Sequence, residues 1–79
     1  MNKVFTDNGW ADYVYWQTED RKTLKKINQL IEDICRNGNE GIGKPEPLRG
    51  DLGGFWSRRI NDKDRLVYRI DDANVYIIG

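Results

Sequence analysis

The amino-acid sequence predicts an α+β fold in which two helices pack on one face of a small, mainly antiparallel sheet. In the N-terminal half, apolar residues recur at the 3.6-residue period of a helix. In the C-terminal half, they alternate at the two-residue period of a strand. A segment rich in Gly, Asn and Pro, residues 37–54, separates the halves. The expected order is strand, helix, helix, strand, strand, strand, and residues 1–79 are expected to form one domain.

The N-terminal half holds a short strand and both helices. The apolar segment KVF predicts a strand at residues 3–5, after which Thr6 or Asp7 can cap a helix that contains WADYVYWQ. Its aromatic side is expected to face a partner. The second helix is expected to start after Asp20 and to stop at Gly38. Its apolar stripe is Leu24, Ile27, Leu30, Ile31 and Ile34.

Three strand patterns follow the glycine-rich segment. They are residues 54–60, 65–70 and 75–79. The short links NDKD and DDAN require neighbouring strands to pair antiparallel. Alternation then places Trp56 and Tyr68 toward the helices and leaves a basic group on the open face. That group is Arg59, Arg65 and Arg69.

The segment KPEP places one carboxylate between the only prolines of the chain. Each proline fixes its own φ at about −65° and favours an extended conformation of the residue before it. Lys44 and Glu46 are therefore expected to be extended. Glu46 is therefore held in one direction, with Lys44 and Arg49 nearby. We expect Glu46, Arg59 and Arg65 to converge on one open concavity.

A fixed carboxylate beside guanidinium groups suits RNA cleavage without a metal. Glu46 could take a proton from a ribose 2′-hydroxyl, and arginines could stabilise the charge that grows on the phosphate. The alternative is that Glu46 forms a salt bridge with Lys44 or Arg49 and only pins the loop. Residue chemistry alone does not decide between them.

Composition removes several classes of function. The chain has 13 basic and 13 acidic residues, so net charge does not indicate a nucleic-acid partner. It has one cysteine and no histidine, which excludes an internal disulfide and argues against a zinc site or another cofactor. No segment has the length of a signal peptide's apolar core or of a membrane span. A cytoplasmic protein is expected.

Three segments together resemble the Txe/YoeB family of the RelE-like superfamily of bacterial toxins. They are YVYWQTEDRKTLKKINQLIEDI, GIGKPEPL and GFWSRRINDKDRLVYRI, and the resemblance covers essentially the whole chain. It implies an mRNA interferase that enters the ribosomal A site and leaves a 2′,3′-cyclic phosphate. It also implies a homodimer and a YefM-like antitoxin, whose disordered C-terminal segment folds on the toxin.

The resemblance also assigns site residues. It implies that Glu46 is the general base and that Arg65 stabilises the phosphate. Arg49 and Arg59 match basic positions around that phosphate, and Lys44 matches a lysine of the same loop.

One feature departs from the family's pattern. Family members end in a short tail that closes on a His-Tyr pair, and its histidine acts as general acid. This chain stops at Gly79 and has no histidine. The tail was removed, which the intact motif favours, or the protein is a natural inactive remnant. In either case we expect impaired cleavage, and the alternative function is a non-catalytic module that binds antitoxin or ribosome.

Overall fold

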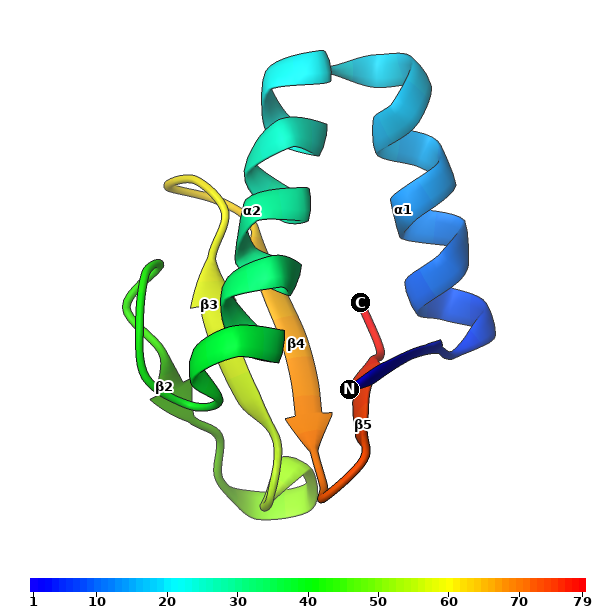
Figure 1. Cartoon of the computed structure of the whole chain (residues 1–79). Helices are drawn as coiled ribbons and strands as arrows, with labels where there is room; N and C mark the ends of the chain where they lie inside the picture. The colour runs from blue at the N-terminus through cyan, green and yellow to red at the C-terminus, as the bar shows by residue number, and fades with distance from the viewer.

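The computed structural model describes residues 1–79, which form two helices on one face of a five-stranded sheet (Figure 1). The helices are α1 (Asp7–Glu19) and α2 (Arg21–Asn37). The strands are β1 (Asn2–Phe5), β2 (Glu46–Pro47), β3 (Trp56–Arg59), β4 (Arg65–Ile70) and β5 (Asn74–Ile77), with a 3₁₀ turn, η1 (Gly50–Leu52), between β2 and β3. The predicted α+β fold is confirmed, with β2 and η1 as additions.

The sheet has the strand order β1-β5-β4-β3-β2. Strands β3, β4 and β5 form the predicted antiparallel meander, and β2 pairs antiparallel with β3. β1 lies at the other edge and runs parallel to β5, with Val4 opposite Tyr76. This pairing brings the two ends of the chain to the same side of the molecule (Figure 1).

Side-chain caps begin both helices where the sequence predicted. The Thr6 hydroxyl accepts a hydrogen bond from the Gly9 N–H at 3.0 Å. The Asp20 carboxylate accepts from the N–H groups of Lys22 and Thr23 at 3.0 and 3.4 Å. These bonds satisfy N–H groups that have no partner inside the helix. Neither helix is long and apolar enough to cross a membrane.

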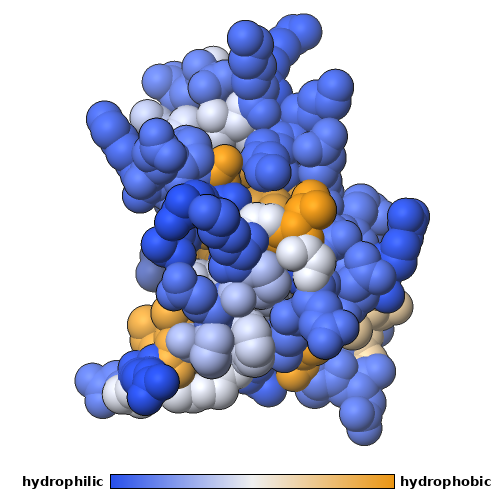
Figure 2. Space-filling view, turned by 90° about the vertical axis from the view of Figure 1, so that its left-hand side faces the viewer, coloured by the Kyte–Doolittle hydropathy of each residue, from blue (hydrophilic) through white to orange (hydrophobic).

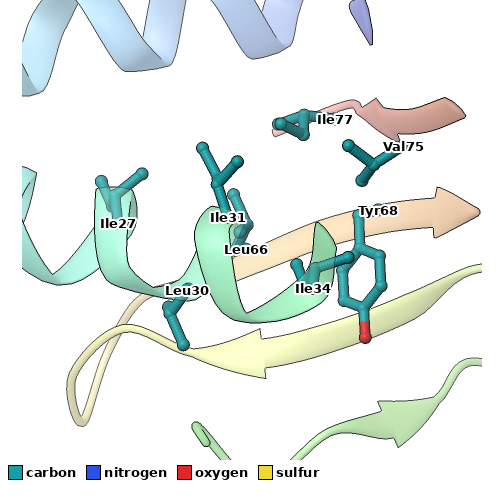
Figure 3. Close-up of a cluster of buried hydrophobic side chains, with 8 residues drawn as sticks. All are labelled: Ile27, Leu30, Ile31, Ile34, Leu66, Tyr68, Val75 and Ile77. Carbon is teal, nitrogen blue, oxygen red and sulfur yellow. The ribbon is translucent and has the colours of Figure 1, made fainter. Parts of the chain in front are cut away.

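The core lies between α2 and the two strands β4 and β5 (Figure 3). Its members are Ile27, Leu30, Ile31 and Ile34 from α2, Leu66 and Tyr68 from β4, and Val75 and Ile77 from β5. Burying one such side chain contributes about 1.5–3 kcal/mol. The helix α2 and the centre of the sheet therefore form the rigid support for the opposite sheet face.

The first helix contributes less to the core than its aromatic sequence predicted. Tyr13 and Trp16 pack against the core, but Trp10 and Val14 are 52% and 42% exposed. The inner face of the sheet is covered mainly by α2, and α1 lies beside α2 (Figure 1). Trp56, predicted to be buried, is only half-buried and packs at the margin of the core.

Candidate functional site

Strand register brings Glu46, Arg59 and Arg65 to the sheet face that points away from the helices. Arg59 is paired with Arg65 across β3 and β4, and Glu46 is paired with Ser57 across β2 and β3. Directly opposed residues share a face, and Ser57 and Arg59 are two positions apart on one strand. The same face continues along β4 to Arg69. The structure thus places these groups together, as the strand alternation predicted.

The carboxylate of Glu46 lies beside a guanidinium group. Its Oε1 is 3.8 Å from Nη1 of Arg65, and the two side chains are 57% and 42% exposed. An exposed pair of this kind contributes about 0–1 kcal/mol, so it can open for a substrate at little cost. The partner of Glu46 is Arg65, and not Lys44 or Arg49 as the loop-pinning alternative required.

The chain reaches β2 by a path that the sequence did not predict. Glu46 is extended within β2, as expected, but Lys44 has a φ of 50°. A non-glycine residue before proline rarely adopts this left-handed conformation, which costs about 1–3 kcal/mol. The turn is held from the preceding residue, because the Gly43 carbonyl accepts a hydrogen bond from the Arg59 N–H at 2.7 Å.

The remaining predicted site residues lie at the margin of this face. Lys44 and Arg49 are exposed and make no salt bridge. Arg49 immediately precedes η1, and Arg69 packs over the ring of Tyr76, 4.3 Å from the ring centre.

The site is an open face, so the predicted concavity is wrong. None of the three cavities of the molecule is lined by Glu46 or Arg59. Arg65 lines a cavity of about 200 Å³, together with Tyr13, Trp16 and the terminal Gly79. The edge of the molecule that carries β2 is mainly hydrophilic, with small separate apolar groups (Figure 2). No group of three or more Cys, Asp or Glu residues lies close enough to hold a metal.

The sequence analysis missed a buried ion pair behind this face. Arg58, fully buried, points inward from β3 and pairs with Asp33 of α2. The Arg58 Nε donates to the Tyr68 hydroxyl at 3.2 Å. Its Nη atoms donate to the carbonyls of Ile42, Gly38 and Glu40 at 2.9, 2.6 and 3.2 Å. One feature of the sequence could have predicted this pair: an arginine at an inward-facing strand position needs a buried partner.

The ion pair keeps Asp33 ionised. Hydrogen bonding from Arg58 holds the pKa of the Asp33 carboxyl below its ordinary value of 3.8, and bonds from Asn37 and the Ile42 N–H act in the same direction. Partial burial opposes the shift. A group with a depressed pKa in the folded state stabilises the fold above its unfolded pKa, and that stability is lost as pH falls.

We therefore expect Asp33→Asn to change the acid limb of the stability curve. The free energy of unfolding of the wild type should fall as pH drops below about 4, toward the depressed pKa of Asp33. The variant should be less stable at pH 7 and lose less stability on acidification, because Asn does not titrate. Urea unfolding between pH 2.5 and 7 measures both. Parallel curves for the two proteins would contradict this assignment.

The two-layer fold closely matches solved structures of bacterial toxins. A structure described as YoeB/ParE toxin from Agrobacterium tumefaciens superposes with a TM-score of 0.96 and 43% identity, covering 100% of this chain and 94% of that one. The YoeB-YefM toxin-antitoxin complex from Staphylococcus aureus contains a chain with a TM-score of 0.94 and 49% identity, covering 100% and 92%.

The family is equally clear from the sequence. Toxin YoeB of Streptomyces coelicolor is 55% identical over 78 residues, which are 99% of this chain and 93% of the relative. The model of the family described as YoeB-like toxin of bacterial type II toxin-antitoxin system matches residues 5–79. The chain belongs to this family and is a toxin of a type II toxin-antitoxin system. The toxins of the family are of the ribonuclease type.

Proposed function

We propose that this toxin is a ribosome-dependent mRNA endoribonuclease with Glu46 as general base. The observation that carries the proposal is the exposed Glu46 carboxylate 3.8 Å from the Arg65 guanidinium, with Arg59 directly opposite Arg65. An acceptor for a proton and two donors for a phosphate thus stand on one open face. An open face, unlike a deep pocket, is accessible to an RNA strand held by a larger partner.

In this mechanism, Glu46 takes the proton of a ribose 2′-hydroxyl. The 2′-oxygen forms a bond to phosphorus while the bond from phosphorus to the 5′-oxygen breaks, which gives a 2′,3′-cyclic phosphate, and the departing 5′-oxygen takes a proton from water to become a 5′-hydroxyl. Arg65 and Arg59 donate hydrogen bonds to the non-bridging oxygens, where charge grows in the transition state. Arg65 leaves its weak pair with Glu46 to do so. Lys44 and Arg49 bind the flanking phosphates.

The same basic face suits a protein inhibitor. The related toxin from Staphylococcus aureus is found in complex with YefM and also as a dimer. We propose that this chain likewise binds a YefM-like antitoxin and forms a homodimer, and that residues 1–79 act as one unit in the cytoplasm, where mRNA on the ribosome is its substrate. Acidic residues of the antitoxin would pair with Arg59 and Arg65.

The second candidate is a module that binds antitoxin or ribosome without cleaving RNA. It is favoured by the absence of histidine from the chain. Lysine and arginine hold their protons tightly at neutral pH, and Glu46 is needed in its ionised form. The 79-residue chain therefore has no efficient donor for the departing 5′-oxygen. Slow, Glu46-dependent cleavage distinguishes an impaired enzyme from this module.

We expect Glu46→Gln to lower the single-turnover rate of cleavage of ribosome-bound mRNA by about 10²–10⁴-fold, because glutamine cannot accept the proton. The matched control is Glu40→Gln, the same change at an exposed position of the same loop with no salt bridge. The control should cleave like the wild type. Equal rates for Glu46→Gln and wild type would exclude Glu46 as the base, and no cleavage by either would favour the binding module.

A further inference from the structure

We propose that the Arg58–Asp33 ion pair is a clamp that positions Glu46, acting through the loop formed by residues 38–43. Arg58 and Asp33 are then positioning residues, since neither reaches the open face. The proposal rests on the function proposed for Glu46, but the clamp itself is defined by contacts within this chain. Three of the carbonyls that Arg58 binds belong to the loop: Gly38, Glu40 and Ile42.

The loop has almost no hydrogen bonds of its own. Among residues 39–45, the Gly43 carbonyl is the only backbone group bonded to another backbone group. Asp33 accepts from the Ile42 N–H at 3.1 Å, and Arg58 donates to the Ile42 carbonyl at 2.9 Å. One ion pair therefore holds both polar groups of a single loop residue. Without the ion pair, the ends of the loop would stay attached to α2 and β2, but Ile42 would have no hydrogen bond to hold it in place.

The glycines of the loop fit the clamp closely. A Cβ on Gly41 would clash with Oδ2 of Asp33 and lie 3.2 Å from Nη1 of Arg58, at a φ of 136°. A Cβ on Gly43 would lie 2.7 Å from the Leu30 side chain, at a φ of 82°. Both positions thus need glycine for space and for conformation. The backbone approaches the ion pair so closely that a movement of either charge must move the loop.

Strand β3 connects the clamp to the site through three consecutive residues. Arg58 points inward to the loop, and its neighbours, the buried Ser57 and the half-buried Arg59, lie on the opposite side of the strand. Ser57 is the register partner of Glu46, and the Arg59 N–H binds the Gly43 carbonyl. The chain between Gly43 and Glu46 is only two residues long. The distance between Glu46 and Arg65 therefore depends on where Arg58 holds the loop.

The test compares Asp33→Asn with Glu32→Gln. Glu32 is the preceding residue of α2, is exposed, and its one salt bridge is with Lys3 at 3.7 Å. In Asp33→Asn, amide hydrogen exchange of Ile42 and Glu46 should rise at least about tenfold more than exchange of the core residues 27–34. The single-turnover rate should fall by about 10- to 100-fold at saturating ribosome, because a displaced base lies out of reach of its proton. The control should change neither measurement.

Arg58→Lys provides a second variant if Asp33→Asn folds poorly. Lysine keeps the positive charge but lacks the planar guanidinium group with its several donors. The variant should therefore fold, and its loop amides should still exchange faster than in the wild type. A uniform rise in exchange across loop and core, with cleavage lowered only in proportion to the unfolded fraction, would overturn the clamp. So would faster loop exchange with an unchanged saturated rate.

The failure of the clamp and the failure of the proposed function give different results. If the wild type shows no cleavage that depends on Glu46, the proposed function fails. The clamp is then judged by the exchange of the Glu46 and Ser57 amides in Asp33→Asn, and unchanged protection of these amides overturns it. If the wild type cleaves and Asp33→Asn cleaves equally well while folded, the clamp alone fails.

Discussion

A short C-terminal tail ending in His-Tyr, added after Gly79, is expected to raise the single-turnover rate of mRNA cleavage by about 10²–10⁴-fold. An imidazole with a pKa of about 6.5 can donate a proton to the departing 5′-oxygen near neutral pH, which no side chain of the present sequence does well. The geometry permits it, because the Gly79 carbonyl accepts a hydrogen bond from the Val67 N–H at 2.8 Å, and Val67 is two positions from Arg65 on β4. A tail leaving Gly79 therefore starts beside the proposed site.

The control is a tail of equal length ending in Gln-Tyr, which keeps the contacts of the tail but cannot act as an acid. Glu46→Gln, combined with the His-Tyr tail, tests whether the gained activity uses the same base. The three proteins should bind ribosomes alike and differ in the rate at saturation. Equal rates with the His-Tyr and Gln-Tyr tails would show that the acid lies elsewhere.

The elements with the strongest local pattern were predicted closely from the sequence. α2 starts after Asp20 and ends before Gly38, because one capping side chain and one unbroken apolar stripe define it. β4 covers the predicted residues 65–70. Alternation along β3 and β4 also placed Arg59 and Arg65 on one face. A strand with one buried face has a fixed register, and the register determines which face each side chain is on. The candidate site was therefore predictable as far as it depends on strand parity.

The missed features depend on contacts between distant parts of the chain. Arg58 and Asp33 are 25 residues apart, so no local period links them. The left-handed Lys44 opposes its own local preference, and it follows a loop held by β3. The aromatic side of α1 is exposed because the longer α2 covers most of the inner sheet face. The restricted backbone of proline correctly predicted the extended conformation of Glu46, but not the conformation of Lys44, the residue before the first proline.

Removal of the clamp should have the largest effect on stability. We expect Arg58→Met to lower the free energy of unfolding by about 3–5 kcal/mol, because it leaves a partly buried carboxylate without its cation. It also leaves the Tyr68 hydroxyl and the loop carbonyls without the donors that Arg58 supplies. At about 0.05–0.15 kcal/mol per residue, a chain of 79 residues has a total stability of only about 4–12 kcal/mol. A substantial unfolded fraction is expected at 37 °C.

Arg59→Met is the matched control, since it makes the same change at the next residue of β3, on the open face. It should shift the urea midpoint little, because Arg59 makes no salt bridge. The double variant Arg58→Met with Asp33→Leu should recover part of the loss, since it removes the unpaired charge as well. Equal midpoints for Arg58→Met and Arg59→Met would contradict the burial of the pair. Full loss without recovery in the double variant would instead assign the stability to the loop carbonyls, which only Arg58 can satisfy.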